Sequence, residues 1–350
     1  MAYKICDKII NMTPYEPISG HYPIRLDANE SFLQPDDGLR LKMMEAVAGI
    51  ALNRYPDALA ADVCAAFANR FGVSPDCVTA GNGSDELISV IISAMLQKGE
   101  TLLTLAPDFS MYRFYGDLQE LSIVAVQKGQ DLTIDTQEIV DTAKQVNARA
   151  IIFSNPCNPT SLVMSAQEVL SIAGQVDALV IVDEAYMDFS DQSVLCKALE
   201  LDNVIVLKTC SKAMGAAALR LGFAVSNRRI TNALRAAKSP YNTDSLSQAI
   251  GVILLRDNEY LDRSIQTIIR SRDILYTGLS RLAEFKQDSI ITVFKPHTNF
   301  VLLRMSDARA CYDALLAEGI VVRHMGEFLR ITAGADTENA AVLSALAKIL

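Results

Sequence analysis

Residues 178–186 read Ala-Leu-Val-Ile-Val-Asp-Glu-Ala-Tyr, a short apolar run that ends in two acids. Five apolar residues bounded by polar ones are typical of a strand buried on both faces of a sheet. An acid at the end of such a strand is costly to bury unless a metal, an arginine or a protonated heterocycle pairs with it. Asp183 is therefore a candidate functional residue.

Similar short runs precede and follow this one along the chain. They lie at residues 101–105, 122–126, 150–153, 204–207 and 222–225. Helical patterns, such as residues 165–175, separate them. Short apolar strands that alternate with helices are typical of βαβ units, so the sequence predicts an α/β protein with a mostly parallel sheet covered by helices on both faces.

The chain has 350 residues, which favours two domains over one. Residues 1–30 are rich in Pro, Gly and Asn and predict an extended arm. Residues 31–254 hold the alternating pattern and predict the large domain. Helical spacing from 245 to about 283 leads into a smaller α+β domain, which we expect over residues 255–350.

Composition and charge exclude several classes of function. Half of the residues are hydrophobic and 21% are charged, which is typical of a soluble globular protein. The net charge of −9 argues against nucleic acid or an anionic membrane as a partner. No apolar stretch is long enough for a membrane span, and residues 1–7 lack the features of a secretory signal, so we expect a cytoplasmic protein. Seven scattered cysteines and three distant histidines have no metal-ligand spacing, and we expect no metal site.

Ligands of open parallel sheets bind beyond the carboxyl ends of the strands, and three further segments there carry candidate residues. Residues 154–160 read Ser-Asn-Pro-Cys-Asn-Pro-Thr, residues 208–212 read Lys-Thr-Cys-Ser-Lys, and residues 80–86 read Ala-Gly-Asn-Gly-Ser-Asp-Glu before an apolar helix. Each also has a plain structural interpretation: a strand-to-helix turn, a solvated lysine, and a helix capped by Ser84.

Two nucleotide-binding classes compete for these segments. Asp183-Glu184 resembles the Walker B end of an NTPase strand, but the sequence contains no G-x-x-x-x-G-K-[ST] loop. Residues 80–86 lack the third glycine of the dinucleotide fingerprint, so NAD binding is weakly supported.

The order and spacing of these segments carry more information than each one alone. Read as Gly-x-Gly-Ser-Asp-Glu, Asn-Pro-x-Asn-Pro, Asp-x-x-Tyr and Ser-Lys with Arg220 eight residues on, the chain resembles the fold-type I aminotransferases that use pyridoxal 5'-phosphate (PLP). Among them it is most similar to the histidinol-phosphate aminotransferases. The resemblance runs from Tyr15 to the C-terminus and includes residues 26–30, 53–57, 109–112, 298–300 and 329–332.

Two positions depart from the family pattern. The usual Asn-Pro-x-Asn-Pro-Thr-Gly ends here in Thr160-Ser161, and the usual Ala-Gly-Leu-Arg reads Ala-Ala-Leu-Arg at 217–220. Both replace glycine with a small residue, so they affect local backbone geometry and touch no side chain that carries chemistry.

The resemblance implies a role for each residue around the cofactor ring. Lys212 would hold PLP as a Schiff base and move the proton at the substrate carbon. Asp183 would pair with the pyridine nitrogen, Asn158 and Tyr186 would donate to the ring's phenolate oxygen, and Tyr112 would stack on the ring. Lys212, Asp183 and Tyr186 form the catalytic set.

The resemblance also implies anion contacts. Ser84, the backbone amide of Asp85, Ser211 and Arg220 would hold the cofactor phosphate, and Tyr55 would reach the phosphate of a partner subunit in a homodimer.

Substrate anions would be bound by arginines. Arg330 would take the α-carboxylate of glutamate or the phosphate of histidinol phosphate, with Arg323 and Tyr15 as further phosphate contacts. Asn29 completes the substrate-binding set.

These roles imply amino transfer between histidinol phosphate and 2-oxoglutarate. An aromatic-amino-acid aminotransferase or a threonine-phosphate decarboxylase of the same fold is the alternative. A non-catalytic PLP-binding sensor is disfavoured, because the chain has no helix-turn-helix and no basic region.

Overall fold

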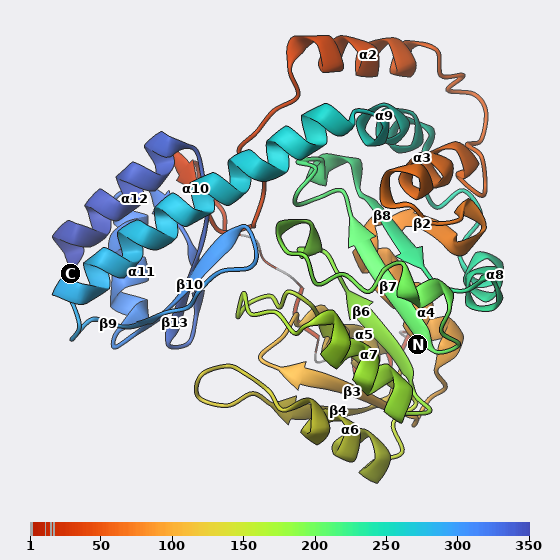
Figure 1. Ribbon diagram of the computed structural model, residues 1–350, viewed down its shortest axis with the longest axis horizontal. Coiled ribbons are helices and arrows are strands. Elements are labelled where there is room, and N and C mark those ends of the chain that lie inside the picture. Colours follow the sequence, from red (N-terminus) through yellow and green to blue (C-terminus); the bar gives the residue numbers. More distant parts are fainter. Residues whose placement is uncertain (1–2, 11, 15, 17) are drawn as a thin grey trace.

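The computed structural model describes residues 3–10, 12–14, 16 and 18–350, and its centre is a seven-stranded sheet (Figure 1). The strand order is β2-β8-β7-β6-β5-β3-β4. Its strands are β2 (Val78–Asn82), β3 (Thr101–Ala106), β4 (Ser122–Gln127), β5 (Ala150–Ser154), β6 (Leu179–Asp183), β7 (Val204–Thr209) and β8 (Leu221–Val225). Strands β3 to β7 pair in parallel, and β8 runs antiparallel to β7 and β2. The prediction of a mostly parallel α/β sheet is confirmed.

Helices cover both faces of this sheet. One face packs against α4 (Gly83–Met95), α5 (Met111–Leu118) and α8 (Arg228–Ala237). The other packs against α3 (Ala61–Phe71), α6 (Thr136–Gln145), α7 (Ala166–Gln175) and α9 (Ser245–Arg256), with α2 (Asp37–Ala48) packed on α9. Successive strand residues point to opposite faces, so Ile181 lies in the α4 layer and Val182 in the α7 layer. The same alternation sends the Asp183 side chain toward the α4 face.

A second, four-stranded antiparallel sheet has its own core. Its order is β12-β13-β10-β9, with bounds β9 (Ile290–Val293), β10 (Phe300–Met305), β12 (Arg323–Met325) and β13 (Phe328–Thr332). Figure 1 shows α10 (Asn258–Phe285) running from α9 to this sheet, where α11 (Ala308–Ala317) and α12 (Asp336–Ile349) also pack. Among the described residues, no helix is both long enough and apolar enough to cross a membrane.

Residues 24–26 pack against the core of this second sheet. Strand β1 (Ile24–Arg25) pairs in parallel with β11 (Ile320–Val321), and Leu26 is buried in the second core. A one-turn helix, α1 (Asp7–Ile10), lies farther upstream. Short 3-10 helices lie at Pro75–Cys77, Met187–Phe189, Lys197–Leu199 and Ala217–Leu219.

Three elements differ from the sequence-based expectations. Residues 78–82 form strand β2, although the polar and glycine residues near Gly81 predict a loop. The helical stretch from 245 to 283 is two helices, because Asp257 ends α9 and its carboxylate accepts a hydrogen bond from the Tyr260 amide at 3.0 Å. Part of the expected N-terminal arm is strand β1. The domain boundary near residue 255 stays a prediction.

Candidate active site

A cavity of about 600 Å³ lies where the carboxyl ends of β5, β6 and β7 face the second sheet. Eleven of the residues proposed from the sequence line it: Asn29, Ser84, Asp85, Asn158, Asp183, Tyr186, Ser211, Lys212, Arg220, Arg323 and Arg330. They come from both sheets and from the segment after β1, so the fold brings together residues 300 positions apart in the sequence.

Asp183 is a buried carboxylate at the floor of this cavity. It accepts hydrogen bonds from the Tyr112 hydroxyl at 2.9 Å and from the Ala185 amide at 3.1 Å. The pKa of Asp183 is raised to about 6, mainly by desolvation and also by the charges of Asp108 and Asp85, while the Tyr112 hydrogen bond opposes this rise. A buried group with acidic neighbours is stabilised in its ionised form by a cation, which the protonated nitrogen of a pyridine ring supplies.

Tyr112 lies beneath the cavity and not in its wall. Its side chain is fully buried, its hydroxyl points to Asp183, and Phe109, three residues earlier, lines the cavity. The two rings meet edge to face with centroids 5.5 Å apart. The stacking role expected for Tyr112 therefore does not fit its position, because Phe109 lies in the cavity-lining segment before α5, whereas Tyr112 is buried in the first turn of that helix.

Lys212 follows β7 by three residues, and its side chain reaches across the cavity. Its ammonium group donates to the Ala28 carbonyl at 3.0 Å and lies 5.9 Å from the centre of the Tyr186 ring. The Tyr186 hydroxyl in turn accepts from the Asn29 amide group at 2.8 Å. The segment at 28–29 therefore contacts both Lys212 and Tyr186.

The amino end of α4 forms an anion-binding corner of the cavity. No side chain among the described residues caps this helix end, so the sequence-based alternative of a Ser84 cap is wrong. A Cβ on Gly222 in β8 would lie 2.2 Å from the Ser84 amide nitrogen, so the strand can pass this close only with glycine there. Next to it the guanidinium of Arg220 lies so close to Gly83 that a Cβ there would be 2.9 Å from Arg220 Nη2. Free amides at a helix start, together with an arginine, are suited to a phosphate.

Asp85 contributes a second buried acid to this corner. Desolvation raises its pKa, and the Arg220 charge opposes that shift. One of its carboxylate oxygens has no hydrogen-bond partner among the described residues.

The two asparagines of residues 155–159 have different positions. Asn155 closes the loop, since its side chain exchanges hydrogen bonds with the backbone of Met164 at 3.0 and 2.8 Å. Asn158 faces the cavity, where its side-chain oxygen accepts from Arg330 Nη1 at 2.5 Å. Only the second is available to a ligand.

Two arginines from neighbouring strands line the side of the cavity formed by the second sheet. Arg323 in β12 is the register partner of Arg330 in β13. Arg330 also donates to the Asp27 carbonyl at 2.6 Å, and its guanidinium lies 5.2 Å from the centre of the Phe300 ring. Two arginines at paired positions of neighbouring strands are suited to a carboxylate or a phosphate.

Tyr55 does not line the cavity. It is 81% exposed and stacks on Tyr241 with ring centroids 4.6 Å apart. The other proposed tyrosine, Tyr15, lies outside the described residues.

The sequence pattern assigned no role to Phe109 or to the partly buried Asp108, although both line the cavity. Asp108 follows the end of strand β3, so the rule that ligands bind beyond strand ends could have found it.

These residues fit PLP on the evidence of the structure. A buried acid has a raised pKa, a lysine lies in the wall, an aromatic ring lines the cavity and a helix start faces an arginine. Together they offer a partner for a protonated ring nitrogen, an amine, a ring contact and a phosphate cradle.

Comparison with known proteins agrees with this fit. Residues 23–349 match the family described as Aminotransferase class I and II. A histidinol-phosphate aminotransferase of Clostridium kluyveri is 39% identical over 342 residues, which cover 96% of each chain. These matches confirm the resemblance to aminotransferases that was drawn from the motifs.

Solved structures confirm the fold. Histidinol-phosphate aminotransferase from Sinorhizobium meliloti, in complex with pyridoxal-5'-phosphate, has a TM-score of 0.89 at 23% identity over 99% of this chain and 97% of that one. L-threonine-O-3-phosphate decarboxylase from Porphyromonas gingivalis has a TM-score of 0.79 at 20% identity over 93% of this chain and 98% of that one. The fold is therefore that of the fold-type I PLP enzymes. The chain belongs to the class I and II aminotransferases and is a PLP-dependent enzyme.

Proposed function

We propose that this enzyme transfers an amino group between histidinol phosphate and 2-oxoglutarate. The observation that carries the proposal is the pair Arg323 and Arg330, which line the same cavity as Lys212 from adjacent strands. The relative at 39% identity, which covers 96% of this chain, is named histidinol-phosphate aminotransferase. Histidinol phosphate and glutamate share an amine and an anionic end, so one arginine site can serve both in turn.

Bound PLP supplies an electron-withdrawing ring that stabilises negative charge on the substrate carbon next to nitrogen. Lys212 is the residue we propose to hold the cofactor covalently and to move the proton at that carbon. Its amine already lies in the cavity wall, so proton transfer gains from proximity. Asp183 keeps the ring nitrogen protonated, and its buried, hydrogen-bonded position favours that ion pair.

The remaining residues orient the cofactor and the substrate. Phe109, which lines the cavity, would contact the ring face in place of Tyr112. Asn158 and Tyr186 would donate to the phenolate oxygen of the ring. The start of α4, with Ser84, Asp85, Ser211 and Arg220, would hold the phosphate.

The test of substrate is half-transamination of the PLP-loaded enzyme with three amines, namely histidinol phosphate, phenylalanine and threonine phosphate. We expect histidinol phosphate to convert the cofactor fastest, as followed by its absorption spectrum. Faster conversion by phenylalanine would assign an aromatic-amino-acid aminotransferase. Loss of carbon dioxide from threonine phosphate would assign a decarboxylase.

Lys212→Ala tests the lysine assignment separately. We expect no turnover, an unchanged far-UV circular dichroism spectrum and loss of the absorption band of lysine-bound PLP. Lys208→Ala is an unsuitable control, because Lys208 is buried and paired with Asp188 at 3.0 Å. Lys197→Ala, at an exposed lysine, is the matched control and should remain fully active. Full activity of Lys212→Ala would refute the assignment.

We further propose a homodimer whose active sites are shared. Large apolar side chains are exposed around α2, the loop after it and the start of α9, and they are Leu41, Met44, Leu52, Tyr55, Leu59, Tyr241 and Leu246. We call this set the α2–α9 patch. A second copy seated on it would cover these side chains and could bring Tyr55 to the partner's phosphate site. We place the enzyme in the cytoplasm, where amino-acid biosynthesis takes place.

A further inference from the structure

Ser161 occupies a backbone position that favours glycine. It ends the turn after β5, where related aminotransferases usually have glycine, and its φ is +62°. Its side chain is completely buried. A serine in the left-handed region is strained relative to glycine, and such strain persists where the surroundings make use of the side chain.

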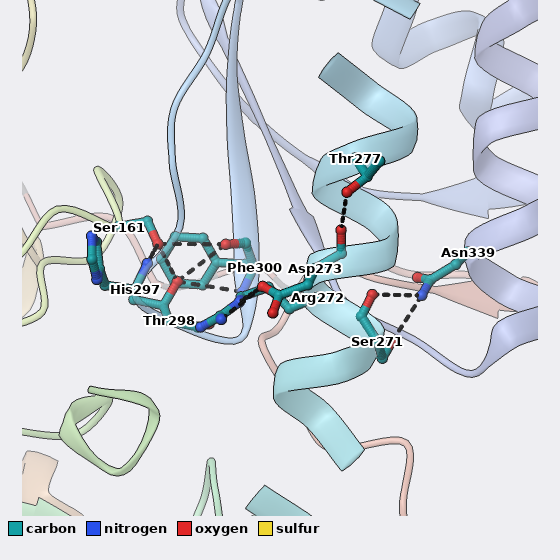
Figure 2. A network of polar contacts seen from close by, with 9 residues as sticks. All are labelled: Ser161, Ser271, Arg272, Asp273, Thr277, His297, Thr298, Phe300 and Asn339. Atoms are coloured by element: carbon teal, nitrogen blue, oxygen red, sulfur yellow. Dashed lines mark hydrogen bonds and ion pairs between the residues drawn. The ribbon is translucent and has the colours of Figure 1, made fainter. Parts of the chain in front are cut away.

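The Ser161 hydroxyl joins the two sheets. Figure 2 shows its contacts with residues 297–300, which lead into β10 of the second sheet. Its oxygen lies 2.5 Å from the Thr298 hydroxyl, accepts from the His297 amide at 3.0 Å, and lies 3.5 Å from the Phe300 carbonyl.

The network continues into helix α10. The Thr298 carbonyl accepts from Arg272 Nη1 at 3.3 Å, and Arg272 is a buried side chain of that helix. The turn after β5 is thus tied to both the strand and the helix of the other part of the molecule.

Both segments joined by Ser161 contact Arg330. Three residues before Ser161, Asn158 accepts a hydrogen bond from Arg330. On the other segment, the Phe300 ring lies 5.2 Å from the Arg330 guanidinium and packs edge-on against Tyr186, with centroids 5.5 Å apart. The spacing between Asn158 and Phe300 therefore sets where the guanidinium can lie.

We propose that Ser161 is a positioning residue for substrate binding. Its hydroxyl fixes Asn158 relative to Phe300 and thereby holds Arg330 toward the cavity before substrate arrives. A side chain that is already ordered loses less entropy on binding. Removing the hydrogen bonds of the Ser161 hydroxyl should therefore weaken substrate binding and leave the proton-transfer step at Lys212 intact. This inference rests on the proposed function in one respect, namely that Arg330 binds the anionic end of the substrate.

The first experiment compares Ser161→Ala with Thr298→Val, which remove the two hydroxyls one at a time. We expect KM for histidinol phosphate and for 2-oxoglutarate to rise roughly three- to tenfold, with kcat changing less than about twofold. The double variant should be about as impaired as the more impaired single variant, because both substitutions remove the hydrogen bond between the two hydroxyls.

A matched control exists at the far end of β8. Ser226 and Thr231 form another buried pair of hydroxyls 2.9 Å apart, away from the cavity. Ser226→Ala should lower Tm and leave both KM values unchanged. A Ser161→Ala variant that behaves in the same way would assign Ser161 a purely structural role and overturn the proposal.

Ser161→Gly separates strain from hydrogen bonding, and it serves if Ser161→Ala does not fold. Glycine relieves the backbone strain but lacks the hydroxyl, so we expect Tm to stay level or rise while KM increases as in Ser161→Ala. An unchanged KM in Ser161→Gly would contradict the proposal.

Succinate binding keeps this test independent of the substrate assignment. Succinate carries carboxylates but no amine, and its binding to the PLP-loaded enzyme is followed by absorbance. A wild-type enzyme inactive on histidinol phosphate would refute the proposed function alone. Weaker succinate binding in Ser161→Gly and Thr298→Val than in the wild type would still support the positioning role of Ser161, and binding equal to that of the wild type would contradict it.

Discussion

At the scale of single residues, the hydrogen bond from Tyr112 to Asp183 connects a fully buried ring to the cavity floor. The hydroxyl lowers the pKa of Asp183 against the opposing effect of desolvation. It therefore helps to keep this carboxyl ionised, which is the form that pairs with a protonated ring nitrogen.

We expect Tyr112→Phe to raise the pKa of Asp183 and to weaken PLP binding roughly tenfold near neutral pH, because a hydrogen bond to a charged group is lost. As the pH is lowered, the affinity of the cofactor-free variant for PLP should begin to fall at a higher pH than that of the wild type. Tyr260→Phe, at a buried tyrosine of α10, is the control. An unchanged pH dependence of PLP affinity in Tyr112→Phe would contradict the assigned role.

Glu184 is the neighbour of Asp183 on the opposite face of the sheet. Its carboxylate accepts from the Ser193 hydroxyl at 2.6 Å and from the Val194 amide at 2.7 Å. Desolvation raises the pKa of Glu184 to about 7, against the lowering effect of the Lys208 charge. The folded protein therefore binds this proton more tightly than the unfolded chain does.

A folded-state pKa above the unfolded value stabilises the protein at low pH, and this stabilisation is lost as pH rises toward 7. Between pH 4.5 and pH 7, we expect the free energy of unfolding of the wild type to fall by about 3 kcal/mol more than that of Glu184→Gln. This figure follows because each pKa unit corresponds to about 1.4 kcal/mol. Urea titrations at several pH values measure this difference. Glu200→Gln, at an exposed glutamate, should show the same pH dependence of stability as the wild type. If the profile of Glu184→Gln also runs parallel to that of the wild type, the raised pKa of Glu184 is contradicted.

The sequence could locate Asp183, Asn158 and Lys212, because each lies at, or within four residues of, the carboxyl end of a strand in the parallel part of the sheet, where ligands bind. It could not separate Phe109 from Tyr112, since both are aromatic and only the folded structure shows that the segment before α5 presents Phe109 to the cavity while Tyr112 is buried. Nor could it assign Ser161, whose hydrogen bonds join segments 137 residues apart.

At the scale of elements, β8 and α4 must pass very close to each other at the anion-binding corner. Strand β2 leads into α4 and pairs with β8, and this antiparallel arrangement brings Gly222 against the Ser84 amide. The pattern of residues 78–82 does not predict a strand, because β2 lies at the sheet edge and its identity depends on pairing with β8, which is far away in the sequence.

We expect Gly222→Ala to destabilise the protein by about 3 kcal/mol or more, because its Cβ would meet backbone that cannot move without displacing α4. The affinity for PLP should fall as well, because we propose that this helix start binds the cofactor phosphate. Gly174→Ala is the opposite case, since Gly174 lies in α7 and nothing is within 4 Å of a Cβ there. It should raise stability by up to about 1 kcal/mol. Equal stabilities of the two variants in chemical denaturation would contradict this account.

At the scale of the whole molecule, substitutions in the α2–α9 patch test the proposed homodimer. We expect the wild-type enzyme to be a dimer in sedimentation equilibrium. Leu52→Arg should shift it toward monomers and lower activity, because it places a charge on an apolar interface. Phe285→Arg replaces an equally exposed aromatic ring at the end of α10 and should leave the dimer intact. A fully active wild-type monomer would rule out shared active sites.

The segment at residues 27–29 has a consequence for how the enzyme matures. Its backbone carbonyls accept from Lys212 and Arg330, and β1 just before it pairs with β11. An early part of the chain is therefore held by parts made hundreds of residues later. During synthesis on the ribosome, the nascent chain can complete its large sheet and still lack a finished catalytic pocket until β13 has emerged. Catalytic competence is thus acquired late, after folding of the large sheet has become possible.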